Sequence, residues 1–123
     1  MTTLGAAAEQ LVARQYQAQD YKLLEKNYVF RHGRQLGEID LIFEKDKEII
    51  FVEVKARSGS KFGGPFEAVD SNKQRRLIKT AKLYLQLHPK FSGYNYRIDV
   101  AGVDIDNPDK PVIILENAIE DLD

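Results

Sequence analysis

The stretch GEIDLIFEKDKEIIFVEVKAR, residues 37–57, decides the fold of this 123-residue chain. Apolar and polar side chains alternate along both of its halves, as they do in strands with two different faces. Asp46 and Lys47 separate the halves and are read as a two-residue turn, which pairs Lys45 with Glu48. The stretch therefore predicts an antiparallel β-hairpin.

This register predicts two different faces for the hairpin. One face is entirely apolar and is expected to lie in the core. On the other face Asp40 lies opposite Glu53, and Glu38 lies opposite Lys55. A slip of one residue would destroy the apolar face, so the assignment of sides does not depend on the turn. The remaining predicted pairs are Phe43–Ile50, Leu41–Val52 and Ile39–Val54 on the apolar face and Ile42–Phe51 on the other.

The facing carboxylates of Asp40 and Glu53 indicate a site of chemistry. Like charges opposed across a strand pair are destabilising, so either a cation lies between them or one is protonated. Carboxylate oxygens and water suit Mg²⁺ or Mn²⁺, and Lys55 is close enough to orient or help deprotonate a bound water. The alternative is a salt-bridge ladder, in which Glu38–Lys55 and a remote Lys or Arg neutralise the patch.

Outward from the hairpin, the pattern predicts two helices and three more strands. The order αβββαββ favours a mixed sheet with helices packed on it. Asp70 and Ser71 provide capping side chains for the second helix, and Pro89 ends it after His88. The expected elements are helices over 4–19 and from about 70 to 88, and strands over 21–30, 37–45, 48–57, 95–104 and 111–117.

The composition indicates a single globular domain over residues 1–123, with 43% hydrophobic and 30% charged residues. The absence of cysteine excludes disulfides, thiolate metal sites and cysteine nucleophiles. No apolar run approaches the roughly 20 residues of a membrane span, and the N-terminus lacks the features of a signal peptide. We therefore expect a soluble cytoplasmic protein with no membrane partner.

The charges are unevenly distributed along the chain. Residues 55–97 contain ten basic side chains and two acidic ones, whereas residues 98–123 contain one basic and eight acidic. A localised basic block is typical of proteins that bind a phosphate backbone, although solvated helix and loop charges give the same pattern. In the acidic tail Asp99 alternates with Arg97, which predicts an ion pair and not a metal ligand.

The hairpin also resembles a known family. Gly37-Glu38-Ile39-Asp40 followed by Glu53-Val54-Lys55 looks like the D…ExK core of the PD-(D/E)XK nuclease superfamily, although Ile39 stands where that superfamily often has proline. Further features lie outside the hairpin, and the full set resembles the bacterial YraN family, relatives of archaeal Holliday-junction resolvases, over residues 4–118. These features are Gly5-x-x-Ala8-Glu9, Phe62-Gly63, Lys73 and Arg97-Ile98-Asp99-Val100.

The resemblance implies a restriction-endonuclease-like α/β/α fold with three layers, a central mixed sheet and Mg²⁺- or Mn²⁺-dependent hydrolysis of phosphodiester bonds. Asp40 and Glu53 would be metal ligands with the Val54 carbonyl, Lys55 the catalytic lysine, and Glu9 a further catalytic group near the metal, directly or through water. Glu38 has no assigned role and is either a partner of Lys55 or a supporting group. The expected nucleic-acid contacts are Arg57, Lys61, Lys73, Arg75 and Arg76.

The leading hypothesis is therefore an endonuclease acting on branched or structured DNA. One alternative is a nucleic-acid-binding module with little activity in a DNA-processing or uptake complex. Another is a purely structural or protein-interaction domain. A junction resolvase needs two active sites, which favours a homodimer by symmetry, but no interface is evident in the sequence.

Overall fold

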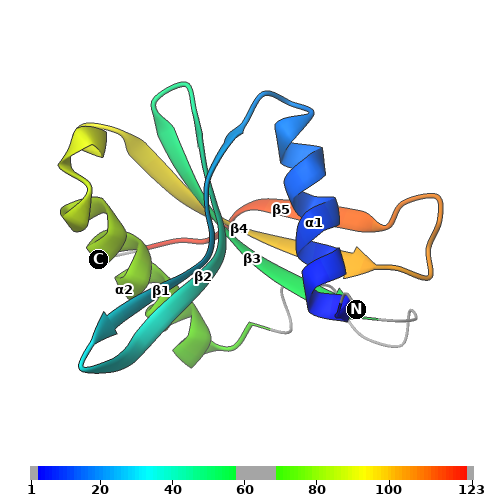
Figure 1. Cartoon of the computed structure of the whole chain (residues 1–123), viewed down its shortest axis with the longest axis horizontal. Coiled ribbons are helices and arrows are strands. Elements are labelled where there is room, and N and C mark those ends of the chain that lie inside the picture. The colour runs from blue at the N-terminus through cyan, green and yellow to red at the C-terminus, as the bar shows by residue number, and fades with distance from the viewer. Residues whose placement is uncertain (1–2, 58–68, 122–123) are drawn as a thin grey trace.

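The computed structural model describes residues 3–57 and 69–121. Within these ranges five strands form one mixed sheet and two helices pack on it, in the order α β β β α β β (Figure 1), so the predicted class and element order are confirmed. The elements are α1 (Leu4–Gln17), β1 (Lys22–His32), β2 (Arg34–Lys45), β3 (Glu48–Arg57), α2 (Ser71–Leu87), the short 3-10 helix η2 (Pro89–Phe91), β4 (Asn95–Asp104) and β5 (Val112–Ile119).

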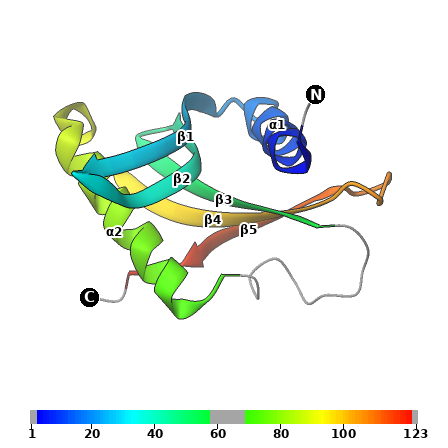
Figure 2. The same ribbon diagram turned by 60° about the horizontal axis from the view of Figure 1, so that its bottom comes forward.

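The two helices cover opposite faces of the sheet, which gives the three layers (Figure 2). Because side chains alternate along the strands, each face of the sheet contributes its own apolar set. Leu41 and Val52 pack with Val12 of α1, whereas Ile42 and Phe51 pack on the α2 side. Both clusters are closed to solvent, so the central strands are buried on both faces.

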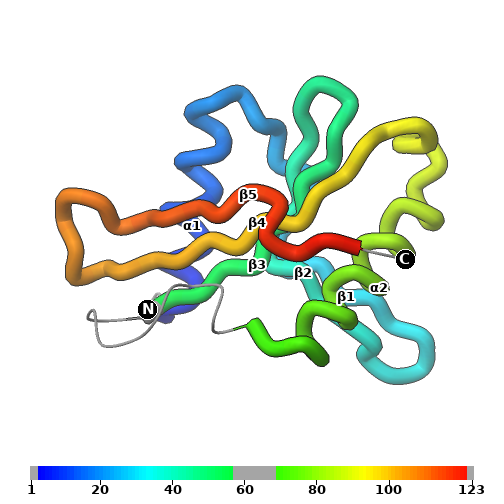
Figure 3. The backbone as a smooth tube through the Cα atoms, turned by 180° about the vertical axis from the view of Figure 1, so that it is seen from behind, coloured from blue at the N-terminus to red at the C-terminus, as the bar shows by residue number. Residues whose placement is uncertain are grey.

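The strands lie in the sheet in the order in which they occur in the chain, β1-β2-β3-β4-β5. Among the strands of the described residues only β3 and β4 are parallel, and α2 lies in the crossover between them. The other neighbours are antiparallel, and Figure 3 shows β4 and β5 from behind, running side by side as a long hairpin. The β3–β4 ladder therefore joins the two halves of the chain.

The predicted turn between β2 and β3 is confirmed. Lys45 pairs with Glu48, and Asp46 and Lys47 have positive φ angles of 50° and 62°, as a type I′ turn requires. The predicted pairs next to the turn are also present in the ladder. They are Phe43–Ile50, Ile42–Phe51 and Leu41–Val52.

The predicted register beyond Leu41 is wrong. The β2–β3 ladder ends at Leu41–Val52, whereas β2 remains paired with β1 through to Arg34. Figure 1 shows the β1–β2 hairpin turning away from β3 at this point. The strands part in the segment that was predicted to pair, so Ile39 packs with Ile42 on the α2 side. The three pairs that do not form in the described ladder are Ile39–Val54, Asp40–Glu53 and Glu38–Lys55.

We call the point where β2 and β3 separate, between Asp40 and Glu53, the fork. The first turn of α2 lies next to the fork, since its Lys73 contacts Glu53. The helix begins at Ser71, as the capping residues predicted. Asp70 is the N-cap, and its carboxylate accepts a hydrogen bond from the backbone N–H of Lys73 at 2.8 Å. None of the helices in the described ranges has the length and apolar character needed to cross a bilayer.

Candidate active site

Asp40 and Glu53 are brought together at the fork, although not as a ladder pair. The Asp40 Oδ2 atom accepts a hydrogen bond from the backbone N–H of Val54 at 2.8 Å. A side chain of β2 thus holds the backbone of β3 just where the ladder between the two strands ends. Glu53 is buried, at 6% exposure, and Asp40 is half-buried, so the two carboxyl groups share a site with limited access to water.

The pKa of Asp40 is raised to about 7. Burial is the largest cause, followed by a hydrogen bond with Glu53 and by the negative charge of that residue. The Val54 N–H and the charge of Lys73 act in the opposite direction without cancelling the effect. Asp40 therefore keeps its proton near neutral pH and shares it with Glu53 through their hydrogen bond, which is one of the two possibilities that the sequence left open.

Two lysines complete the centre of the site. Lys73 Nζ lies 3.1 Å from Glu53 Oε2. Burial lowers the pKa of Lys55, and its hydrogen bond with Lys73 lowers it further. Burial also opposes the charge on Lys73, but that hydrogen bond and the Glu53 carboxylate outweigh it and raise the pKa of Lys73. The site thus contains Lys73, which keeps its positive charge, and Lys55, which gives up its proton more easily.

The raised pKa of Asp40 gives a testable dependence of stability on pH. The folded protein keeps this proton up to about pH 7, whereas an unfolded chain loses it near 3.8. The folded state binds more protons between these values, so the contribution of Asp40 to stability is full below 3.8 and is lost as pH rises through about 7. Asn does not ionise, so Asp40→Asn removes this loss of stability with rising pH. Its amide oxygen can still accept the hydrogen bond from the Val54 N–H.

In metal-free buffer we expect Asp40→Asn to gain stability over the wild type as pH rises from about 4 to about 8, by on the order of 2 kcal/mol. Urea unfolding followed by circular dichroism across this range measures the difference. A constant difference between the two proteins at every pH would contradict a shared proton at the fork.

Glu9 reaches the fork from the opposite layer. It is half-buried on α1, and the pKa of its carboxyl is raised by burial and by the charge of Asp40. Glu9 therefore interacts electrostatically with Asp40, one of the two strand carboxylates. Glu38, which is exposed on β2 beyond the fork, raises the Glu9 pKa as well, and no ion pair with Lys55 is found for it among the described residues.

Asn27 of β1 is a polar residue of this site that was not predicted from the sequence. With its amide nitrogen turned toward Glu9, it donates to Oε1 at 3.1 Å and to Oε2 at 3.3 Å, and this bond lowers the Glu9 pKa. Asn27 has a φ of 52°, a conformation that asparagine tolerates better than other non-glycine residues. An asparagine within a predicted strand was the available signal.

Replacing Asn27 by Gly is expected to raise the pKa of Glu9 further, because the carboxylate loses its donor. Gly accepts the positive φ, so the strand is expected to keep its conformation. Carboxyl ¹³C chemical shifts of Glu9 during a pH titration measure this effect. The exposed Asn107 in the β4–β5 turn provides a control, since Asn107→Gly is expected to leave the Glu9 titration unchanged.

The predicted nucleic-acid contacts divide into three groups. Lys73 lies in the centre of the site, on Glu53. Arg75 and Arg76 are exposed on α2, and the Arg75 guanidinium donates to the Asn72 side chain within the same turn. Lys61 lies in 58–68, outside the described residues, and so does the predicted Phe62-Gly63 feature. The backbone of Arg57 ends β3, but its side chain lies outside what the structure describes.

The donor chemistry at the fork suits a hard divalent cation. In the described parts of the chain, no cluster of three or more His, Cys, Asp or Glu side chains could hold a metal. Mg²⁺ does not need one, because it binds through one or two carboxylates and keeps waters or substrate phosphate in its other positions. Asp40 and Glu53 are such a pair, and the proton between them is what a cation would displace.

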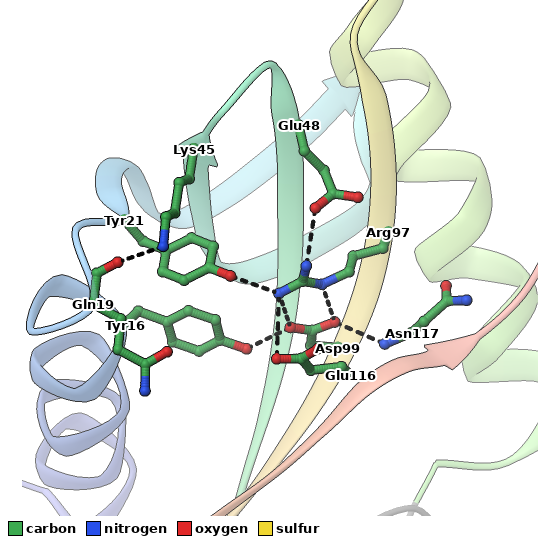
Figure 4. Close-up of polar contacts among 9 residues, drawn as sticks. All are labelled: Tyr16, Gln19, Tyr21, Lys45, Glu48, Arg97, Asp99, Glu116 and Asn117. Atoms are coloured by element: carbon green, nitrogen blue, oxygen red, sulfur yellow. Dashed lines mark hydrogen bonds and ion pairs between the residues drawn. The ribbon is translucent and has the colours of Figure 1, made fainter.

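Asp99 is an ion-pair partner, as predicted. It is fully buried on β4, and Arg97 Nε lies 3.0 Å from its Oδ1. Tyr16 Oη donates to Asp99 Oδ2 at 2.6 Å, and the Asn117 N–H donates to Oδ1 at 2.9 Å (Figure 4).

Arg97 also contacts Glu48, Glu116 and the Tyr21 hydroxyl. This network joins α1, β3, β4 and β5 and belongs to the scaffold of the site.

The chain is similar to proteins of one bacterial family. The model of the uncharacterised protein family UPF0102 matches residues 8–103. A UPF0102 protein of Caldanaerobacter subterraneus is 40% identical over 108 residues, covering 88% of this chain and 84% of the relative. One of Syntrophomonas wolfei is 46% identical over 88 residues, covering 72% and 73%. One of Acinetobacter baumannii is 41% identical over 101 residues, covering 82% and 73%. The chain belongs to the UPF0102 family, also known as YraN, as its motifs predicted.

Proposed function

We propose that this protein is a metal-dependent endonuclease that hydrolyses phosphodiester bonds in branched or otherwise structured DNA. One observation carries the proposal. The buried carboxyl group of Glu53 and the half-buried one of Asp40 are held together at the fork by a hydrogen bond, the pKa of Asp40 is raised to about 7, and Lys55 lies beside them with a lowered pKa. Carboxyl groups kept close at a cost in stability are typical of a functional site.

The residues at the fork have distinct parts in this proposal. Asp40, Glu53 and the Val54 carbonyl would hold Mg²⁺ or Mn²⁺. When bound, such an ion polarises a phosphate and lowers the pKa of a water. Lys55 Nζ, with its lowered pKa, orients the attacking water and exchanges a proton with it. The ammonium of Lys73 adds positive charge opposite the phosphate.

Glu9 and its donor Asn27 complete the site from the other side of the fork. A carboxyl whose pKa lies above its usual value keeps its proton to higher pH and is better suited to act as a general acid. Hydrolysis by water in this way needs no covalent intermediate on the protein. This agrees with the absence of cysteine from the chain.

A second candidate function has its own support. Lys73 already neutralises Glu53, and the shared proton neutralises one further charge, so the fork is balanced without a cation. Lys73 is thus the remote lysine that the salt-bridge alternative required. A fork that is neutral without a metal ion favours a nucleic-acid-binding module with little activity. Calorimetric titration of the wild type with Mn²⁺ distinguishes the two, because only the nuclease requires a bound divalent ion.

The decisive experiment is cleavage of end-labelled four-way-junction, flap, single-stranded and duplex DNA with Mg²⁺, with Mn²⁺ and with EDTA. The matched control is the double variant Glu53→Gln, Lys55→Ala. We expect cutting that depends on the divalent ion and is absent in the variant. Binding of DNA by both proteins with no cutting by either would favour the binding module.

A further inference from the structure

A cavity of about 230 Å³ lies between the β1–β2 hairpin, close to its tip, and the first two turns of α2. Residues 35–38 of β2 line one wall, and Lys73, Arg76 and Leu77 of α2 line the other. Figure 3 shows the start of α2 and this hairpin side by side. We call this cavity the hairpin groove.

The spacing of the two walls is fixed by a close approach of backbone and helix. A Cβ atom added to Gly37 would lie 1.9 Å from Thr80 Oγ1, so only glycine allows α2 to come this near to β2. Thr80 in turn donates to the Arg76 carbonyl at 2.7 Å, which holds its side chain in place. The groove is therefore a formed feature of the fold.

The hairpin groove opens directly beside the proposed catalytic centre. Lys73 belongs to both, because it lines the groove and its Nζ lies 3.1 Å from Glu53. A strand whose phosphate lies at the fork would thus reach the groove with an adjoining nucleotide.

The charges around the groove suit a phosphate backbone. Arg76 is exposed, and among the described residues no carboxylate pairs with it. Arg31 and Arg34 are exposed at the tip of the hairpin, farther from the fork on the same arm. Exposed cations are therefore present on α2 and at the hairpin tip, as phosphate-backbone binding requires, and Glu38 is the one carboxylate among the described lining residues.

The size and lining of the groove favour a single base. Its volume is below the roughly 300 Å³ at which pockets for drug-sized ligands begin, so it is too small for a base pair. Leu36 and Leu77 supply apolar surface. Gln35 and Glu38 supply polar groups on the β2 wall, and Lys73 and Arg76 face them from the α2 wall. A base has apolar faces and hydrogen-bonding edges, and it matches this combination only when it is unpaired.

We propose that the hairpin groove binds one unpaired nucleotide next to the bond to be cut, with its base against Leu36 and Leu77 and its phosphate at Arg76. The inference rests on the proposed nuclease function and narrows it. The substrate class is then DNA with an unpaired nucleotide at the cleavage point, as at a flap, an overhang or an opened junction.

Binding measured without cleavage tests this inference. Fluorescence anisotropy in EDTA compares a blunt duplex, the same duplex with a short single-stranded overhang, and that overhang with its junction nucleotide made abasic. We expect the wild type to bind the overhang at least about 5-fold more tightly than the abasic form. Gln35→Ala is expected to reduce this preference, and Leu36→Ala to reduce it more, while both bind the blunt duplex as the wild type does.

Arg76→Ala tests the phosphate contact, and Lys79→Ala is its matched control. Both are exposed cations of α2, but only Arg76 lines the groove. For the overhang DNA, Arg76→Ala is expected to reduce the slope of log affinity against log salt by about 1, and Lys79→Ala to leave it unchanged. Equal losses in the two variants would show only an effect of net charge and would overturn the inference.

The outcomes separate this inference from the proposed function. If the wild type cuts DNA but binds the three DNAs equally, or binds none of them in EDTA, the groove inference fails and the nuclease stands. If the groove variants lose the preference but the wild type cuts no substrate with any divalent ion, the groove stands as a binding site and the nuclease proposal fails.

Discussion

Asp40→Asn is expected to lower divalent-dependent cleavage by on the order of 1000-fold or more, because it removes one of the two carboxylates proposed as metal ligands. Glu53→Gln is expected to do the same. Both variants are expected to keep the fold, since the amide introduced by Asp40→Asn still offers an oxygen to the Val54 N–H. Cleavage kinetics and calorimetric titration with Mn²⁺ measure the two losses separately.

The control for these variants is Asp109→Asn, which removes one exposed carboxylate in the β4–β5 turn, away from the fork. It is expected to change neither cleavage nor Mn²⁺ binding. Asp40→Asn would then combine lost activity with greater stability above about pH 7, the opposite of what simple damage to the fold produces. Retention of full Mn²⁺ affinity in both Asp40→Asn and Glu53→Gln would refute the assignment of the metal ligands.

Asp99→Ala is expected to lower the free energy of unfolding by about 3–5 kcal/mol, the largest effect on stability expected outside the apolar core. Asp99 is fully buried, and its loss leaves Arg97, the Tyr16 hydroxyl and the Asn117 N–H without their shared acceptor. Urea unfolding followed by circular dichroism measures the change.

Glu116→Ala is the matched control, because Glu116 contacts the same arginine at 3.8 Å but is 67% exposed. Its loss is expected to cost at most about 0.5 kcal/mol. Equal effects of the two substitutions would mean that the arginine is satisfied by solvent and that Asp99 does not organise the network.

The local pattern of the sequence was sufficient for the elements and for part of the hairpin. Alternation and the two-residue turn predicted the pairs from Lys45–Glu48 to Leu41–Val52, and these are confirmed. The ion pair of Arg97 with Asp99 was also predictable, because the two residues lie on the same face of one strand.

The fork was not predictable from that pattern. Residues 38–40 continue the alternation without a break, so nothing local indicates that β2 leaves β3 there. The departure depends on partners distant in the sequence: β1 stays paired with β2, and α2 packs close to Gly37. For the same reason Lys73 was predicted as a phosphate contact, and the sequence did not identify it as the remote lysine that pairs with Glu53.

Position 40 is under two different constraints in evolution. Its side chain is a proposed metal ligand, and it also accepts the hydrogen bond from the Val54 N–H. A descendant that abandoned the chemistry would be free to change Glu53, but at position 40 it would still need a short side chain with an oxygen. Drift should therefore begin at position 53, and position 40 should pass through asparagine before any apolar residue. The order is testable, because Asp40→Ala is expected to be less stable than Asp40→Asn by about 1–3 kcal/mol.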